Sequence, residues 1–180
     1  MTQHGADIRD AIWHQLEVAV ENHSHGWRTP VLANVDADGI PQARTVVLRR
    51  VDRQARRLFF YTDHRSPKAK QLRSQNRACF VFWCQQLRWQ LRAQTTVQIE
   101  SDGLLVQGAW NSISATAAAF DYLSLEAPGS PMELIREGQA DKHALGIIVA
   151  KVHELDWLEL NAQGHRRARV SDADCQWLVP

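Results

Sequence analysis

The sequence has few of the residues and runs that define several protein classes. Its three cysteines, Cys79, Cys84 and Cys175, are odd in number and form no C-x-x-C pair, so neither a disulfide framework nor a zinc site is indicated. No run approaches about eighteen consecutive apolar residues, and the N-terminus has neither the basic start nor the apolar stretch of a signal peptide. We therefore expect a cytoplasmic protein with no membrane partner.

A surplus of charge is also missing. The chain carries 21 Lys and Arg against 20 Asp and Glu, a formal net charge of +1. Nucleic-acid binding needs a basic surplus, so no nucleic-acid partner is expected, although the arginines within 49–57 leave such a barrel as a third interpretation. His23 and His25 stand in a polar loop, where histidine is usually solvated, and we predict no metal site.

What is present fits one compact domain covering residues 1–180. Hydrophobic residues make up 44% of the chain and charged residues 23%, which is close to the globular average. Apolar residues at helical spacing predict an N-terminal helix over 7–20 and a second over 113–123. Capping and proline signals predict shorter helices that begin at Ser66 and Ser130.

The rest of the chain consists of short β-rich runs separated by turn residues. The predicted strands cover residues 30–36, 40–51, 58–62, 78–84, 89–99, 145–160, 166–170 and 176–179. The 40–51 run is apolar on both faces, which is typical of a barrel or a subunit interface, whereas 89–99 has one polar face that includes Gln90. Because strands follow one another with helices appended, we predict a mainly β (α+β) fold, a six- to seven-stranded antiparallel barrel.

The segment 61–68 (YTDHRSPK) carries the strongest chemical signal. A strand ends at Tyr61 and Thr62, Arg65 follows, and a helix begins at Ser66 with Lys68 in its first turn. The free amides and positive dipole end of a helix N-terminus attract an anion, and a serine hydroxyl and a lysine strengthen the attraction. The segment therefore predicts a phosphate site, with a simple helix cap and a solvated lysine as the alternative.

The preceding strand favours the phosphate interpretation. A hairpin between 40–51 and 58–62 would bring Arg44 opposite the end of the next strand, close to the helix start. Arg44, Arg65, Ser66 and Lys68 would then converge on one dianion. Arg49, five residues on, should point to the opposite face unless a β-bulge intervenes, and we expect it to serve another part of the ligand.

Four runs together resemble the central block of the pyridoxamine 5'-phosphate oxidase family. They are RTVVLR (44–49), YTDHRSPK (61–68), NRACFVFW (76–83) and LRWQLRAQTTVQI (87–99), and the resemblance covers roughly residues 30–100. It implies an FMN-binding split β-barrel that forms a homodimer, with two FMN molecules held between the subunits.

The resemblance also implies roles for individual residues. It assigns the FMN phosphate to Arg44 and Lys68 with help from Ser66, and the ribityl and phosphate region to Tyr61 and Thr62. The resemblance also implies that the backbone of Thr45, Val46, Val47 and Leu48 lies along the isoalloxazine ring and that Gln90 contacts the ring. It implies that Trp157 lies near the flavin and that Arg49 is directed at substrate and flavin.

The part of the chain after residue 100 departs from the family pattern. The arginine-rich segment before the QGAW motif (107–110) is absent, and Ala168 stands where a histidine is expected within GHRRAR (164–169). The chain therefore resembles relatives of the oxidase rather than the oxidase itself. We expect an FMN-dependent oxidoreductase that transfers hydride with an undetermined small-molecule substrate, and no catalytic residue is assigned. The alternative is a non-catalytic flavin- or haem-binding module.

Overall fold

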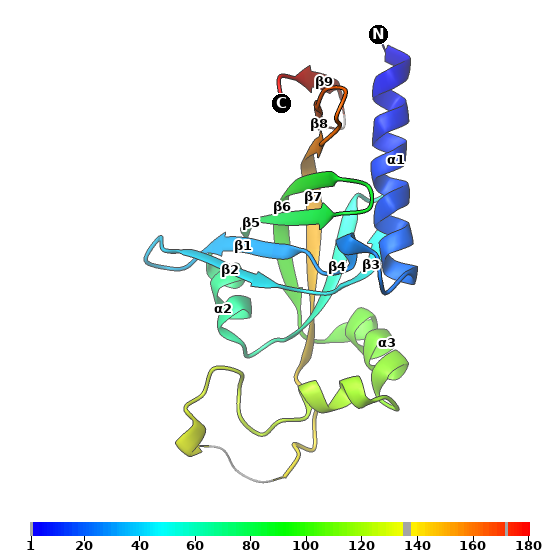
Figure 1. Ribbon diagram of the computed structural model, residues 1–180. Coiled ribbons are helices and arrows are strands. Elements are labelled where there is room, and N and C mark those ends of the chain that lie inside the picture. Colours follow the sequence, from blue (N-terminus) through cyan, green and yellow to red (C-terminus); the bar gives the residue numbers. More distant parts are fainter. Residues whose placement is uncertain (1, 135–137, 172) are drawn as a thin grey trace.

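A computed structural model of the protein describes residues 2–134, 138–171 and 173–180 (Figure 1). These residues form one antiparallel sheet of nine strands. The strands are β1 (Val31–Val35), β2 (Pro41–Thr45), β3 (Leu48–Asp52), β4 (Arg57–Asp63), β5 (Arg77–Cys84), β6 (Trp89–Glu100), β7 (Leu145–Glu159), β8 (Arg166–Val170) and β9 (Cys175–Leu178).

The sheet runs in the order β2-β1-β5-β6-β7-β4-β3, and the β8–β9 hairpin is added along β7. β2 and β3 are consecutive in the chain yet lie at opposite ends of this order, so the two residues between them, Val46 and Val47, cross from one sheet edge to the other. The mainly β, split-barrel fold class is thereby confirmed. The strand count is higher than predicted, in part because the 40–51 run divides into two strands.

Helices and short 3₁₀ helices are attached outside the sheet. They are α1 (Thr2–Glu21), η1 (Gly26–Arg28), α2 (Pro67–Ser74), α3 (Gly103–Ile113), η2 (Ala117–Tyr122) and η3 (Met132–Leu134). None of the helices in the described ranges is long and apolar enough to cross a membrane.

The predicted helix over 113–123 is wrong. The α-helix ends at Ile113, where the prediction begins, and residues 117–122 form only a 3₁₀ helix. The Ser112 hydroxyl donates to Ala109 O at 2.7 Å and the Thr116 hydroxyl donates to Ile113 O at 2.7 Å. Such side-chain bonds to the backbone compete with helical hydrogen bonds and favour a helix end.

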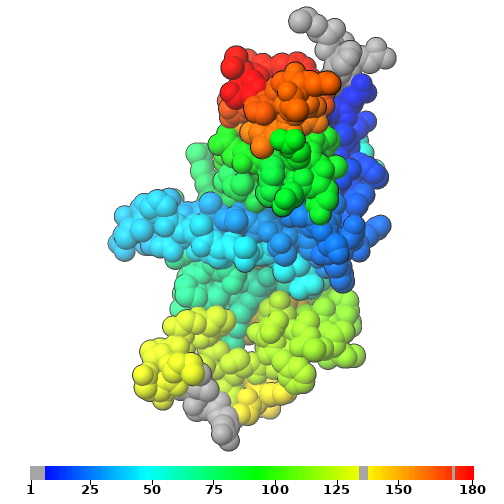
Figure 2. All heavy atoms as spheres, viewed as in Figure 1, coloured from blue at the N-terminus to red at the C-terminus, as the bar shows by residue number. Residues whose placement is uncertain are grey.

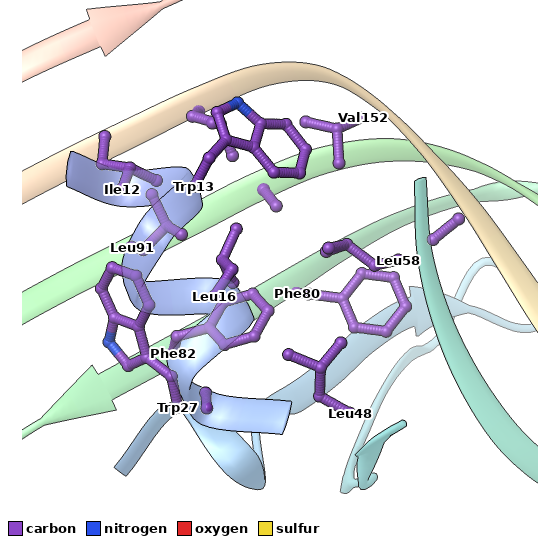
Figure 3. Packing of buried hydrophobic residues seen from close by; sticks show 14 of the residues in the cluster. Ile12, Trp13, Leu16, Trp27, Leu48, Leu58, Phe80, Phe82, Leu91 and Val152 are labelled. Atoms are coloured by element: carbon purple, nitrogen blue, oxygen red, sulfur yellow. The ribbon is translucent and has the colours of Figure 1, made fainter. Parts of the chain in front are cut away.

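One large apolar cluster fills the barrel and extends beneath α1. Figure 3 shows Ile12, Trp13 and Leu16 of α1 directed toward side chains of the strands, among them Phe82 and Leu91. Inside the barrel Phe60 and Phe80 stack with ring centroids 4.4 Å apart. Burial of these side chains supplies the main driving force for the fold.

The two ends of the molecule differ in regularity. The β8–β9 hairpin and the start of α1 lie at one end, and the 114–134 segment lies at the other, beyond α2 and α3 (Figures 1 and 2). β7 runs the length between them, and its register against β6 shifts once, where Gln94 pairs with Glu154 but Thr95 pairs with Val152. The irregular end is therefore connected to the rigid barrel through β7 and α3.

Candidate functional site

The helix start that the sequence predicts is present. α2 begins at Pro67 with Ser66 as its N-terminal cap residue, and Ser66 O accepts hydrogen bonds from the amides of Ala69 at 3.0 Å and Lys70 at 3.1 Å. The Ser66 hydroxyl is buried and donates to Asp63 O at 2.7 Å, with Thr62 Oγ1 3.4 Å away. In this state the serine stabilises the turn, and its hydroxyl would have to rotate to donate to an anion.

Arg44 and Lys68 lie together beside this turn. Arg44 Nη2 donates to Gln71 Oε1 of α2 at 3.1 Å, and Nη1 donates to Asn34 Oδ1 of β1. Burial, followed by the Arg44 charge, lowers the pKa of Lys68, and Asp63 only partly offsets this. Burial also lowers the pKa of Arg44.

No hydrogen bond or ion pair to Lys68 is found within residues 2–134, 138–171 and 173–180. Two partly buried cations that repel each other, and whose repulsion Asp63 only partly offsets, are stabilised by a bound anion. A guanidinium and an ammonium donate charge-assisted hydrogen bonds, the kind that a phosphate accepts most strongly. The chemistry of this donor set therefore fits the phosphate of a nucleotide cofactor. Arg44, Ser66 and Lys68 are called the phosphate cluster below.

The cluster forms by a route other than the predicted hairpin. β2 pairs with β1, where Arg44 lies opposite Leu32, and only β3 pairs with β4. Arg44 is thus on a strand at the far edge of the sheet from β4. Arg44 reaches α2 because α2 packs against β1, the strand next to β2, and against β6.

Arg65 does not join the cluster. Its guanidinium donates to the buried Asp63 carboxylate, with Nη2 at 2.7 Å, and to the backbone oxygens of residues 124–126 at 3.0 to 3.3 Å. The hydrogen bonds from Arg65 to Asp63 raise the pKa of the arginine. Arg65 therefore ties the 114–134 segment to the end of β4, and its use as a phosphate ligand stays a prediction.

Arg49 occupies a β-bulge. Leu48 pairs with Phe60 and Arg50 pairs with Phe59, so Arg49 is the extra residue on β3. Its guanidinium carbon lies 5.3 Å from the centre of the Tyr61 ring, and its Nε is buried without a hydrogen-bond partner. Burial raises the pKa of Tyr122 to about 12 although the Arg49 charge opposes this rise, which places Tyr122 near the same guanidinium.

Residues 45–48, which lead from β2 into β3, directly precede Arg49. Val46 and Leu48 point into the core, Thr45 is exposed, and Val47 is half-buried. The Val46 amide donates to Pro30 O at 3.0 Å. The backbone of residues 45–48 is therefore held in place from the core side.

Gln90 and Trp157 lie away from the phosphate cluster. Gln90 is on the outer face of β6, where it pairs with Trp83 and Leu158. Trp157 faces the core from β7, is fully buried, and contacts the Trp89 ring edge-on at 5.1 Å. Within one subunit neither side chain meets Arg44 or Lys68, and their flavin contacts stay predictions.

Comparison with known protein families decides the relationship. Residues 10–101 match the family described as "Pyridoxamine 5'-phosphate oxidase, FMN-binding domain". The chain belongs to this family. FMN is accordingly the cofactor of this pyridoxamine 5'-phosphate oxidase-related domain, as the sequence predicts, and the match includes every member of the phosphate cluster.

Curated relatives carry the name pyridoxine/pyridoxamine 5'-phosphate oxidase. The protein of Thermosynechococcus vestitus is 36% identical over 107 residues, 53% of this chain and 49% of that one. The protein of Roseobacter denitrificans is 42% identical over 85 residues, 47% of this chain and 41% of that one. The match thus spans about half or less of the length of these relatives.

Solved structures are similar over nearly the whole chain. A pyridoxamine 5'-phosphate oxidase-related, FMN-binding protein from Nostoc punctiforme has a TM-score of 0.75 at 24% identity, covering 96% of this chain and 97% of that one. PhzG from Burkholderia lata, solved with tetrahydrophenazine-1-carboxylic acid, has a TM-score of 0.76 at 16% identity, covering 95% and 91%. At these identities the likeness shows a shared fold.

The residues that support the site are those that sequence reasoning missed. Asn34 and Gln71 hold Arg44, and Asp63 holds Arg65. Gln71 follows Lys68 by three residues and therefore shares its helix face, and Asn34 is a polar residue at an inward position of β1. Both signals are local, but neither says which arginine the side chain contacts.

Proposed function

We propose that this protein is a cytoplasmic, homodimeric FMN-dependent oxidoreductase that transfers hydride between a small-molecule substrate and the flavin. The observation that carries the proposal is the pairing of Arg44 with Lys68, two adjacent and partly buried cations beside the α2 N-terminus, without an ion-pair partner for Lys68 in the described part of the chain. Bound FMN would supply the hydride-accepting chemistry.

The chain's own residues would bind and orient the cofactor. Arg44 and Lys68 would neutralise the phosphate, and the rigid 45–48 backbone would define one wall. Arg49, whose guanidinium stacks on Tyr61, would place a positive charge beyond the phosphate cluster along β4. A cation beside a flavin favours its anionic reduced form, so Arg49 would act on the cofactor's potential.

The outer face of the sheet supports the dimer. Val31 and Trp83 are exposed large hydrophobic residues on neighbouring strands of this face, and Val81 between them is half-buried. Exposed apolar side chains grouped on one face are typical of protein interfaces. Gln90 pairs with Trp83 on the same face and would then be available to a flavin held between two copies.

The arginines of β8 lie beside β7, where Arg167 pairs with Leu158. Arg167 and Arg92 both bond to the buried Asp156, and Arg166 bonds to Glu159. Because their partner carboxylates balance them, these arginines would contribute less charge to a flavin than Arg49 does.

Purified full-length protein tests the proposal in three steps. Mass spectrometry of the molecule released on denaturation should identify FMN, and sedimentation should give a dimer. Anaerobic addition of NADPH, NADH or pyridoxamine 5'-phosphate should bleach the flavin absorbance with at least one donor. Yellow protein that none of them reduces would favour the binding module, and colourless protein that does not take up added FMN would refute the flavin assignment.

A further inference from the structure

A cavity of ≈ 300 Å³ lies between α3 and the outer face of β4 and β7. Phe59, Tyr61 and Ile147 form its floor, and Leu104, Leu105 and Ala109 of α3 form its wall. Figure 1 shows α3 beside the lower part of β7, at the end of the barrel that holds the irregular segment. We call this cavity the α3 pocket, and its size is at the lower limit of ordinary small-molecule sites.

The β-bulge brings Arg50 to the floor of this pocket and Arg49 beside it, next to Tyr61. Leu48 and Val51 both pack on the core, so the two residues between them face outward together. The Arg50 guanidinium carbon lies 4.8 Å from the centre of the Phe59 ring, and that of Arg49 lies 5.3 Å from the centre of the Tyr61 ring. Phe59 and Tyr61 are two residues apart on one face of β4, so the two cations are neighbours.

Among the described residues, no acidic side chain lines the α3 pocket. Neither Arg49 nor Arg50 forms an ion pair with any described residue. The Ser112 hydroxyl is committed to Ala109 O at 2.7 Å. α3 itself, GLLVQGAWNSI, contains no Lys, Arg or His. The charged donors at the pocket are therefore the Arg50 guanidinium and, beside it, that of Arg49, and apart from the Tyr61 and Ser112 hydroxyls the other lining side chains are apolar.

We propose that the α3 pocket binds an apolar, ring-bearing monocarboxylate, with its ring against Phe59, Tyr61 and α3 and its carboxylate on Arg50 and Arg49. The assignment of this ligand as the substrate rests on the proposed function, because the pocket shares Tyr61 with the predicted flavin site. A planar guanidinium matches the two oxygens of a carboxylate.

A phosphate ester fits the pocket less well. A phosphate has three strong acceptor oxygens and close to two negative charges, and it needs donors on several sides. All the charged donors here come from one strand, and α3 offers only apolar atoms. The desolvation cost of a dianion would be larger than that of a monoanion, with no additional donors to offset it.

Calorimetric titration with three naphthalene probes tests the ligand class. We expect 2-naphthoate to bind more tightly than the neutral 2-naphthalenemethanol by roughly tenfold or more, since hydrogen bonds to charged groups have that effect. Tighter binding of 2-naphthyl phosphate than of 2-naphthoate would overturn the carboxylate assignment. Equal binding of the neutral probe would overturn the role of the arginines.

Gly108→Leu tests the location. A Cβ added at Gly108 meets no atom within 4 Å, so a leucine there extends into the cavity without strain and improves helix propensity. We expect 2-naphthoate affinity to fall roughly tenfold or more while folding is retained. Gln107→Leu adds the same side chain one residue earlier, outside the pocket, and should leave affinity unchanged. Equal binding by Gly108→Leu and the native protein would place the ligand elsewhere.

Arg50→Gln tests the charge, with Arg57→Gln as its matched control because Arg57 is exposed at the start of β4 and does not line the pocket. The first should weaken 2-naphthoate roughly tenfold or more and the second should not. Titrations are run on both FMN-loaded and FMN-free protein. Failure to take up FMN would refute the proposed function alone, whereas FMN-loaded protein that binds no 2-naphthoate would refute only the pocket's assignment.

Discussion

The phosphate cluster and the α3 pocket differ in how their cations are held. At the cluster, Arg44 is fixed by hydrogen bonds to Asn34 and Gln71, and α2 packs on the barrel core through Leu72. At the α3 pocket, Arg49 and Arg50 stack on aromatic rings, and the apolar wall includes the exposed Leu104. A rigid anchor suits a compact group such as a phosphate, whereas a wall with exposed side chains suits a ligand whose shape is less strictly specified.

The largest effect should come from removing the cluster's charges. Arg44→Ala combined with Lys68→Ala removes two charge-assisted bonds and should weaken FMN binding by roughly 10²- to 10⁴-fold. Quenching of flavin fluorescence during titration measures this affinity. Lys70→Ala removes an exposed lysine two residues away on α2 and should have no comparable effect. Equal FMN affinity in the double variant and the native protein would show that the phosphate cluster does not bind the FMN phosphate.

The helices beside the two sites should also differ in how much they stabilise the fold. Leu72→Ala empties a buried position under α2 and should lower the free energy of unfolding by about 2–5 kcal/mol. Leu104→Ala in α3 changes a side chain that is 88% exposed and should stay within about 0.5 kcal/mol of the native value. Denaturant unfolding followed by fluorescence measures both. Similar losses would mean that the α3 wall is as well packed as α2.

The link between the 114–134 segment and the end of β4 can be cut at Asp63. Asp63→Asn removes the charge that accepts from Arg65, whose guanidinium also bonds to the oxygens of residues 124–126. We expect a loss of about 1–3 kcal/mol, together with faster hydrogen exchange in 117–126 than in the native protein. Ser124→Ala keeps the backbone oxygen that Arg65 uses and serves as the control. Unchanged exchange in Asp63→Asn would show that the segment is held by other contacts.

The smallest effect concerns Lys68 in FMN-free protein. Because burial and Arg44 lower the pKa of Lys68, the unfolded chain keeps this proton to higher pH than the folded chain does. Stability of the FMN-free protein should therefore rise with pH as Lys68 loses its proton, up to the ordinary lysine pKa near 10.4. Lys68→Met should remove this slope and slightly raise the melting temperature while weakening FMN binding. A steeper slope in the variant would contradict the direction.

Local signals were sufficient for part of the site. The Ser66-Pro67 helix start and the inward and outward faces of β6 follow from capping and alternation, and the structure has both. The family resemblance, which rested on residues 30–100, is confirmed by the match over 10–101. The fold class follows from the same segment.

Long-range pairing was not predictable in the same way. The run 40–51 is apolar on both faces whether it forms one strand or two, so the crossing at Val46 and Val47 leaves no mark in the pattern. The partners of Arg65 lie near residue 125, and no local rule connects the two. α3 was not predicted. The alanines within ISATAAAF favoured a helix over 113–123 instead, which the hydrogen bonds of Ser112 and Thr116 to the backbone interrupt.

The bulge on β3 makes the charge of the α3 pocket adjustable by a single codon. In-frame deletion of either Arg49 or Arg50 would restore uninterrupted alternation, and Leu48 and Val51 would still face the core. One guanidinium would disappear from the outer face without any change to an apolar position. A lineage with this fold could thus change the number of cations that meet its ligand in one mutational step, with the barrel interior left intact.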